Sequence, residues 1–361
     1  MIKYLDIVDY NKIDFVYKKI CSSTRHKEKL VRFELFKFTN CFYIYNTLLE
    51  NKYIHGKYNV FLIKYPKYRI IMSENLIDKI VNHLVSYYFL FPVIEPKLID
   101  FNIATRTGRG LDKGIDYIKK YLNKMKNDYH NYYVLKCDIT KFFYNIDHEI
   151  LFSKLQKIIK DEDILSLIKN IVNSTNLDYV NIEIEKILNN EISKVKNKNI
   201  INKLKNIPCY KKGKGLPIGN MTSQILAIFY LNNVDHFIKE KLGIKYYVRY
   251  QDDLIMFHQD KEYLKKVKNC IGIELAKLKL ELNNKTVISR LDNGFNFLGY
   301  RFLFKEKRII ILPVNSMKKR IRKRYKKEGK IILERYNGYL NRCLGFNRIY
   351  SLEYRNDIKR I

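Results

Sequence analysis

The segment KYYVRYQDDLIMFHQ (residues 245–259) constrains the fold more than any other part of the sequence. Two runs of aromatic and aliphatic residues, KYYVRY and LIMFH, flank the short polar stretch QDD. This pattern predicts two strands joined by a tight turn, with Asp252 and Asp253 at the tip of a β-hairpin. An Asp-Asp pair is weak on its own, because a chain with this many acidic residues contains about one such pair by chance.

The charge of the chain predicts its partner. There are 69 Lys and Arg residues against 37 Asp and Glu residues, which leaves a formal net charge of +32. Self-repulsion of that size is tolerated where a polyanion neutralises it, so nucleic acid is the expected partner. AT-rich coding DNA, which raises the Lys content everywhere, is the alternative explanation. Hydrophobic residues make up 47% of the sequence, which excludes a disordered chain.

Cysteine usage and hydropathy predict the location. The six cysteines lie far apart and form no C-x-x-C pair, so neither a zinc site nor a disulfide framework is indicated. Widely spaced cysteines favour a reducing, cytoplasmic setting. The N-terminal segment carries charges in every turn, unlike a signal peptide, and no apolar stretch approaches bilayer-spanning length. We therefore expect no membrane partner.

Several segments predict elements that position polar side chains. YYVLKC (132–137) predicts a buried strand that ends at Asp138. KYRIIMS (67–73) predicts another strand, and GKGLPIGN (213–220) is a loop that leads into an apolar helix. Residues 152–212 are helical and increasingly rich in Lys and Asn, which indicates a solvated insertion.

The C-terminal segment is more basic than the rest. Residues 305–361 contain 18 Lys and Arg against 5 Asp and Glu, a local balance of +13. We interpret this segment as a helical module that lies along a phosphate backbone.

A strand that ends at Asp138 and a hairpin with Asp252 and Asp253 at its tip have a specific chemical use. Carboxylates are hard oxygen ligands suited to Mg²⁺, and two such ions can bind the attacking and leaving oxygens of a phosphoryl transfer. Three acids brought together would repel one another unless cations lie between them. The alternative is that Asp138 caps the next segment and the pair only makes a turn.

The order of the motifs resembles that of the reverse transcriptases: DITKFF, GLPIGNMTSQ, YQDD, LNNKT and FNFLGYRF. The chain looks like a bacterial non-LTR reverse transcriptase from about residue 60 onward. The resemblance implies an α+β, right-hand polymerase with fingers, a palm with a small antiparallel sheet, and a helical thumb. The expected parts are an N-terminal basic segment and fingers (1–130), a palm (131–304) containing the insertion at 152–212, and a basic thumb (305–361).

The resemblance also implies the catalytic chemistry. It assigns catalytic roles to Asp138, Asp252, Asp253 and Lys285, with Lys285 as a candidate proton donor to the leaving pyrophosphate. The implied metal-binding positions are Asp138, Ile139, Asp252 and Asp253. They would hold two Mg²⁺ ions, for which Mn²⁺ can substitute.

Further positions are implied for substrate and nucleic acid. The nucleotide-binding set is Arg69, Phe143, Ile218, Gly219, Gln224 and Tyr250. Arg69 would grip the triphosphate, and Phe143 would exclude a ribose 2′-OH unless it is only a core aromatic. The nucleic-acid-binding set is Arg106, Arg109, Gly299, Lys318, Lys319 and Arg320. For the loop that carries Arg106 and Arg109, a capped turn is the alternative.

Motif B indicates a subclass. Most reverse transcriptases have Q-G-x-x-x-S-P there, whereas this chain has Ile218 and Gln224 at the first and last positions. The I-G-x-x-x-S-Q form resembles the enzymes of diversity-generating retroelements, which copy a template RNA with frequent errors opposite adenine. An aliphatic side chain cannot hydrogen-bond the incoming nucleotide, so selection at that contact would rest on shape.

The resemblance leaves alternatives and implies partners. A phage-defence reverse transcriptase that makes templated or untemplated DNA is the first alternative, and a catalytically inactive RNA-binding protein is the second. The expected partners are an RNA template, a DNA or RNA primer and dNTPs. A small basic accessory protein and a structured non-coding RNA are expected for a retroelement enzyme.

Overall fold

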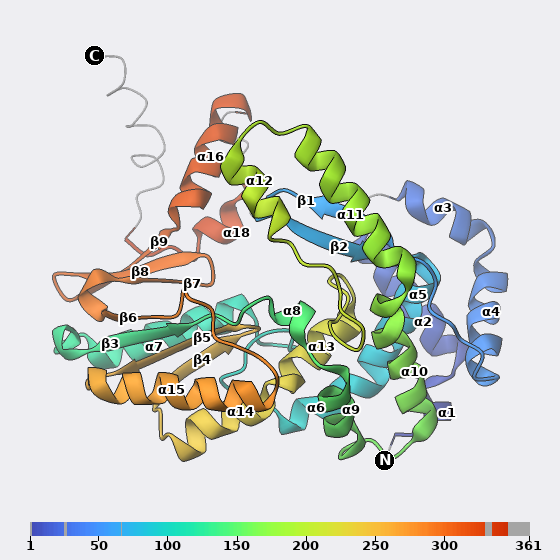
Figure 1. Cartoon of the computed structure of the whole chain (residues 1–361), viewed down its shortest axis with the longest axis horizontal. Helices are drawn as coiled ribbons and strands as arrows, with labels where there is room; N and C mark the ends of the chain where they lie inside the picture. The colour runs from blue at the N-terminus through green and yellow to red at the C-terminus, as the bar shows by residue number, and fades with distance from the viewer. Residues whose placement is uncertain (1, 25–26, 66, 329–333, 346–361) are drawn as a thin grey trace. The chain divides into compact units, whose positions relative to one another are not determined.

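The computed structural model describes residues 2–24, 27–65, 67–328 and 334–345 (Figure 1). The chain forms two compact units, and each unit is assembled from segments that are distant in sequence. Unit 1 comprises residues 1–98, 141–232 and 277–280, and unit 2 comprises residues 99–140, 233–276 and 281–361. The division into fingers, palm and thumb at residues 130 and 304 stays a prediction, and residues 346–361 of the expected thumb lie outside the described part.

Unit 1 is mainly helical. Its N-terminal part contains α1 (Tyr4–Ile7), α2 (Tyr10–Ser23), α3 (Glu28–Leu35), α4 (Lys37–Leu49), β1 (Asn59–Ile63), β2 (Arg69–Ser73), α5 (Leu76–Val85), a π-helical turn (Ser86–Leu90) and α6 (Phe91–Ile94). Its second part contains α8 (Phe142–Asn145), α9 (His148–Gln156), α10 (Glu162–Asn173), α11 (Asp178–Ser193), α12 (Lys198–Lys205) and α13 (Met221–Tyr230). β1 and β2 pair antiparallel, from Asn59 opposite Ser73 to Ile63 opposite Arg69.

The Lys/Asn-rich segment is a packed part of unit 1, which differs from the expected solvated insertion. α11 lies against β1, and its residues Val180, Ile184 and Leu188 are buried together with Ile70 and Met72 of β2. These apolar residues of α11 recur at intervals of four, so they line one face of the helix. The polar residues Glu185, Lys186, Asn189 and Asn190 are exposed. Composition alone obscured this amphipathic pattern.

Unit 2 contains two antiparallel sheets. The first has the order β4–β5–β3–β6, and the second has the order β7–β8–β9. The strands are β3 (Tyr133–Cys137), β4 (Tyr246–Tyr250), β5 (Asp253–His258), β6 (Val287–Arg290), β7 (Phe295–Phe297), β8 (Tyr300–Lys305) and β9 (Arg308–Pro313). The helices are α7 (Leu111–Met125), α14 (Asn232–His236), α15 (Lys261–Lys277), α16 (Asn315–Glu328) and α18 (Asn337–Leu340).

The core of unit 2 explains why the first sheet forms. β3 and β5 alternate side chains between two covered faces, and both strands are therefore almost continuously apolar. Ile118 and Leu122 of α7 pack in one cluster with Val134 of β3 and Ile255 of β5. The predicted strand before Asp138 and the predicted hairpin are both confirmed.

Residues 308–313 differ from expectation, because they form strand β9 where the sequence suggested the start of a helical segment. The run RIIILP is β-branched and apolar, and it completes a sheet by pairing with β8. The expected helices follow it as α16 and α18.

Among the helices of the described residues, none combines the length and the apolar character that crossing a bilayer requires.

Candidate active site

Two strand ends bring the predicted acids together in unit 2. β3 and β5 pair antiparallel up to Cys137 opposite Leu254, so one further step of the register places Asp138 beside Asp253. Residues opposite each other in an antiparallel pair project to the same face of the sheet. Asp252 occupies the turn immediately before β5, and all three aspartates are partly exposed.

Lys136 lies on the same face as these acids. Its Nζ is 3.4 Å from Oδ1 of Asp253, whose side chain is 39% exposed. Asp138 follows Lys136 by two positions of extended chain, so their side chains share one face. The ammonium thus offsets part of the negative charge at the strand ends, a contribution that the sequence motifs did not reveal.

A buried ion pair supports the turn that carries Asp252. Gln251 has a left-handed backbone (φ 54°), which a residue without a glycine's freedom adopts only when its surroundings hold it there. The guanidinium of Arg249 donates through Nη1 to the carbonyl of Gln251 at 2.9 Å and through Nε to Oδ1 of Asp235 at 2.7 Å. The Gln251 side chain also donates to Thr105 Oγ1 at 2.8 Å.

Arg249 and Asp235 are both fully buried. Burial alone would lower the pKa of Arg249, but the charge of Asp235 and the hydrogen bonds to it prevail and raise that pKa. Tyr247 donates its hydroxyl to Asp235 at 2.6 Å, and burial raises the pKa of this phenol. A charged residue inside the apolar strand YYVRY was the available sequence signal for this pair.

The motif NNKT forms a turn against Asp138. Asn283 donates its backbone N–H to the Asp138 carbonyl at 2.7 Å, and the Asp138 N–H lies 3.4 Å from Thr286 Oγ1. Lys285 sits in this turn, with its N–H donating to Asn283 Oδ1 at 3.0 Å, and its side chain is exposed. The NNKT turn that carries Lys285 therefore lies beside Asp138, and the catalytic role of Lys285 stays a prediction.

The strand-end acids offer the oxygen donors that Mg²⁺ prefers. No group of three or more His, Cys, Asp or Glu side chains in the described part of the chain is arranged to hold a metal ion by itself. Mg²⁺ commonly binds one or two carboxylates and completes its shell with water and substrate phosphates. Asp138 and Asp252 fit that incomplete type of site. Ile139 was the other implied metal-binding position. The bond from Asn283 goes to the carbonyl of Asp138 and does not involve the carbonyl of Ile139.

Unit 1 assembles a second set of predicted residues around motif B. The Met72 N–H donates to the Ile218 carbonyl at 2.9 Å, which ties the motif-B loop to β2, the strand that begins at Arg69. A Cβ added at Gly219 (φ 143°) would lie 2.4 Å from the Met72 carbonyl oxygen, so only glycine allows this approach. Gln224 is exposed in the first turns of α13.

Phe143 joins the same set. Its carbonyl accepts a 2.7 Å bond from the N–H of Leu216, two residues before Ile218. Phe142 is 2% exposed and supplies the core aromatic, whereas Phe143 is only partly buried. This division of the two rings favours Phe143 as the residue available to a ligand.

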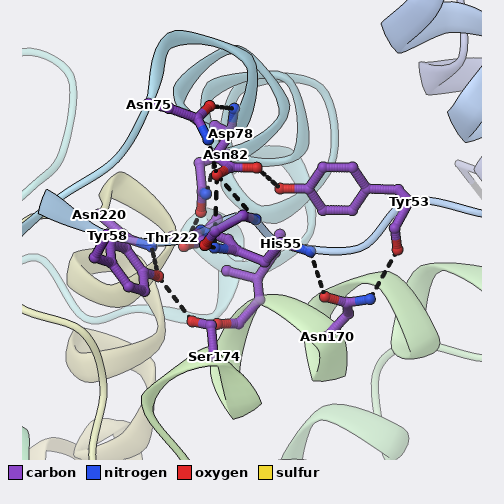
Figure 2. Close-up of polar contacts among 12 residues, drawn as sticks. Tyr53, His55, Tyr58, Asn75, Asp78, Asn82, Asn170, Ser174, Asn220 and Thr222 are labelled. Carbon is purple, nitrogen blue, oxygen red and sulfur yellow. Dashed lines mark hydrogen bonds and ion pairs between the residues drawn. The ribbon is translucent and has the colours of Figure 1, made fainter. Parts of the chain in front are cut away.

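A buried polar network lies beneath the motif-B loop (Figure 2). Asn220 donates to the Tyr58 hydroxyl at 2.9 Å, and that hydroxyl is 2.7 Å from Ser174 Oγ. Thr222 donates to Asn82 Oδ1 at 2.5 Å. Asn220 ends the loop and Thr222 lies in the first turn of α13, while their partners come from the segment before β1, the turn after α10, and α5. The network therefore holds the end of the loop and the start of α13. Sequence reasoning missed this network, although the polar residues between glycine and the apolar helix were its signal.

The same network continues around Asp78. This buried carboxylate accepts bonds from the Tyr53 hydroxyl at 2.8 Å and from the Gly56 N–H at 3.0 Å. Desolvation, followed by the charge of Asp78, raises the pKa of the nearby Glu74 to about 8. The Glu74 side chain is partly exposed, but its Oε1 is shielded from solvent and has no hydrogen-bond partner among the described residues.

The predicted nucleic-acid ligands of unit 2 are dispersed. Arg106 donates to the carbonyls of Ile99 and Asn102 at 2.6 and 2.8 Å, so it braces its own loop as the capped-turn alternative anticipates. Arg109 pairs with Asp100.

Gly299 has φ 82° in the two-residue turn between β7 and β8, where the tight turn requires a positive φ. The expected close approach of a backbone is not seen, because a Cβ added there would meet, among the described residues, only the Tyr339 ring, at 3.9 Å. Lys318, Lys319 and Arg320 lie together on α16, where Lys319 is exposed. Their contacts with nucleic acid stay predictions.

Solved structures similar to this chain include three telomerase structures from two Candida species. Telomerase from Candida albicans, in complex with the TWJ fragment of telomeric RNA, shares 12% identity over 86% of this chain and 58% of its own, with a TM-score of 0.45. Apo telomerase from Candida tropicalis shares 18% identity over 69% and 47%, with a TM-score of 0.45. Its form truncated from the C-terminal domain shares 16% identity over 70% and 54%, with a TM-score of 0.44.

The chain thus spans between 47% and 58% of those structures' length. No curated protein sequence matches it. The sequence pattern of the family described as "Reverse transcriptase (RNA-dependent DNA polymerase)" matches residues 63–302 and so includes every motif from β2 to β8. Because this match covers more than half of the sequence, and because the predicted α+β class is confirmed, the chain belongs to the reverse transcriptase family.

Proposed function

We propose that the protein is an RNA-directed DNA polymerase that synthesises cDNA by two-metal nucleotidyl transfer. The observation that carries this proposal is the placement of Asp138 and Asp253 on neighbouring positions of two paired strands, with Asp252 in the adjoining turn. Membership of the reverse transcriptase family supports the same activity. RNA template, DNA or RNA primer and dNTPs are the proposed substrates.

The residues of the chain would have the following roles in catalysis. Asp138 and Asp252 would hold the Mg²⁺ ions, with Asp253 and the Ile139 carbonyl as further positions; Mn²⁺ would substitute. The bound ions would stabilise the charge that develops on the attacking and leaving oxygens. Lys285, held beside Asp138 by the NNKT turn, would donate a proton to the leaving pyrophosphate.

Nucleotide selection would rest on the set in unit 1. Arg69 at the exposed start of β2 would bind the triphosphate through its planar guanidinium. Phe143 would exclude a ribose 2′-OH. Ile218, Gly219 and Gln224 would form the surface against the incoming nucleotide, with Tyr250 contributing from the catalytic hairpin.

The finer role that motif B supports best is error-prone copying in a diversity-generating retroelement. Ile218 cannot hydrogen-bond a sugar or base, so discrimination at this contact would depend on shape. A small basic accessory protein and a structured non-coding RNA would then be partners.

Defence against phage is the second candidate. Its support is the ordered α11–α12 segment that precedes motif B in unit 1, which the retroelement assignment does not account for.

Primer extension on an adenine-containing RNA template with Mg²⁺ and dNTPs tests the activity. Asp252→Asn should abolish product, whereas the matched variant Asp260→Asn, at the far end of the same hairpin, should remain active because an Asn still caps α15. Incorporation by Asp252→Asn at the wild-type rate would refute the mechanism. Sequenced products with errors concentrated at adenine would favour the retroelement, and untemplated DNA would favour the defence role.

A further inference from the structure

A basic groove lies in unit 2 between α7 and the β8–β9 hairpin. Its volume is about 630 Å³, and five cationic side chains line it: Lys119, Lys126, Lys305, Lys307 and Arg308. Among the described residues that line it, Glu306 is the only acidic one. None of the five cations forms an ion pair in the described part of the chain, although the pKa of the nearby Asp112 carboxylate is lowered by its hydrogen bond from Arg342 and, to a smaller extent, by the charge of Lys119. The lining therefore carries a net positive charge.

The groove is far from the catalytic acids within the same unit. Tyr129, which precedes β3, stacks on Phe304 with ring centroids 4.4 Å apart, and Phe304 directly precedes Lys305. The hairpin therefore lies at the start of β3, whereas Asp138 follows its end. The six steps of extended chain from Tyr132 to Asp138 separate the two places by about 20 Å.

The backbone of the hairpin tip favours a role for its charged residues. Lys305 pairs with Arg308, and the two-residue turn between them has left-handed φ values of 50° at Glu306 and 58° at Lys307. Asn-Gly is the pair that adopts such a turn with least strain. This turn instead carries two charged residues whose Cβ atoms disfavour the conformation, which is the kind of local conflict that accompanies functional sites.

We propose that this groove binds the phosphate backbone of a folded RNA stem, at a site separate from the catalytic cleft. The cations come from three elements and surround a concave surface, which suits a polyanion better than a single ion. The described residues that line the groove include no aromatic side chain, so none of them offers a platform on which unpaired bases could stack. Recognition therefore falls on the backbone of a paired stem.

Asn123 directs the groove toward RNA and away from DNA. It lines the groove four residues after Lys119 and three residues before Lys126, the C-cap residue of α7. At this spacing the three side chains lie on one face of the helix. The two lysines are about 10 Å apart along the helix axis. An amide at this place can both donate to and accept from a 2′-hydroxyl, the group that distinguishes RNA from DNA.

The test measures the affinity of the full chain for a labelled RNA stem-loop of about 16 base pairs, without nucleotide or metal. The groove variant is Lys119→Gln/Lys126→Gln/Arg308→Gln. The matched control is Lys120→Gln/Lys124→Gln/Lys266→Gln, which removes the same charge from exposed lysines of the same unit outside the groove. Because this binding measurement uses neither nucleotide nor metal, failure of the proposed catalytic function would not change its result.

We expect the groove variant to bind the stem at least tenfold more weakly than the control. The slope of log affinity against log salt should fall by about 2 to 3, since up to three phosphate contacts are lost. Extension of a primer–template too short to reach the groove should keep its rate. Asn123→Ala should reduce the preference for the RNA stem over a DNA stem of the same sequence.

Three outcomes would overturn the proposal. Equal weakening by the control variant would mean that only net charge matters. Unchanged binding by the groove variant would show that the RNA stem does not bind in the groove, whose partner would then be a different molecule. Equal affinity of the wild-type chain for the RNA and DNA stems would remove the assignment to RNA.

Discussion

Arg249 and Asp235 form a fully buried ion pair whose remaining guanidinium nitrogen donates to the carbonyl of Gln251, directly before Asp252. The backbone of Arg249 is held as well, because its N–H donates to the carbonyl of Phe101 at 2.9 Å. A buried charge pair is costly to desolvate and seldom stabilises more than apolar residues of the same size. Because the pair also holds the turn that carries Asp252, we predict that it has a role other than stability.

We predict that replacing both residues of the pair restores the free energy of unfolding but not the turnover rate. Asp235→Asn leaves an uncompensated buried charge and should lower the free energy of unfolding by about 3–5 kcal/mol. The double variant Asp235→Leu/Arg249→Met should recover most of that loss in urea unfolding. Its kcat should still fall about tenfold or more, because the bond to Gln251 is absent. Full activity of the double variant would show that the pair is only structural.

The acids and their strands could be predicted from sequence because both signals are local. Asp138 follows an apolar run, and Asp252 and Asp253 interrupt two such runs, so strand periodicity alone locates them. The support for these acids could not be predicted in this way. Lys136, Asp235 and Arg249 act through pairings that the register of β3, β5 and α14 creates, and no single window of sequence contains both partners.

The misread α11 segment has a different cause. Lysines and asparagines are frequent in residues 152–212 as a whole, whereas α11 itself contains one Lys and has three buried apolar residues spaced by four. Likewise, β9 was obscured by the basic residues on either side of RIIILP. In both places the composition of the surrounding segment masked a short apolar pattern.

Phe143 should control the choice between deoxyribonucleotides and ribonucleotides. In the proposed role, Phe143→Ala removes the side chain that a 2′-OH would meet, so incorporation of rNTPs should rise at least tenfold relative to dNTPs. The ratio of kcat/KM values for dCTP and CTP in single-nucleotide extension measures this change. An unchanged ratio, with dCTP incorporation intact, would assign Phe143 to packing alone.

Tyr58→Phe should loosen the motif-B loop. The substitution leaves the buried Asn220 amide without its partner and should cost about 1–3 kcal/mol of stability. We expect the KM for dNTPs to rise several-fold with little change in kcat. Tyr53→Phe is the matched control, because it removes a buried hydroxyl bonded to Asp78 in the same network but not to the loop. An equal rise in KM for both variants would mean that general destabilisation, not the loop, is responsible.

The pH dependence of the free energy of unfolding should reveal the protonation of Glu74. Its pKa is raised from 4.5 to about 8 in the folded chain, so the folded state retains a proton that the unfolded state releases near pH 4.5. Its contribution to stability is therefore fully present below about pH 4.5 and is lost as pH rises toward 8, by at most about 1.4 kcal/mol per pH unit. Glu74→Gln stays neutral and should remove this decline, so its advantage over wild type in urea unfolding should grow between pH 5 and pH 8. A constant difference between the two proteins across that range would show that Glu74 is already ionised in the folded state.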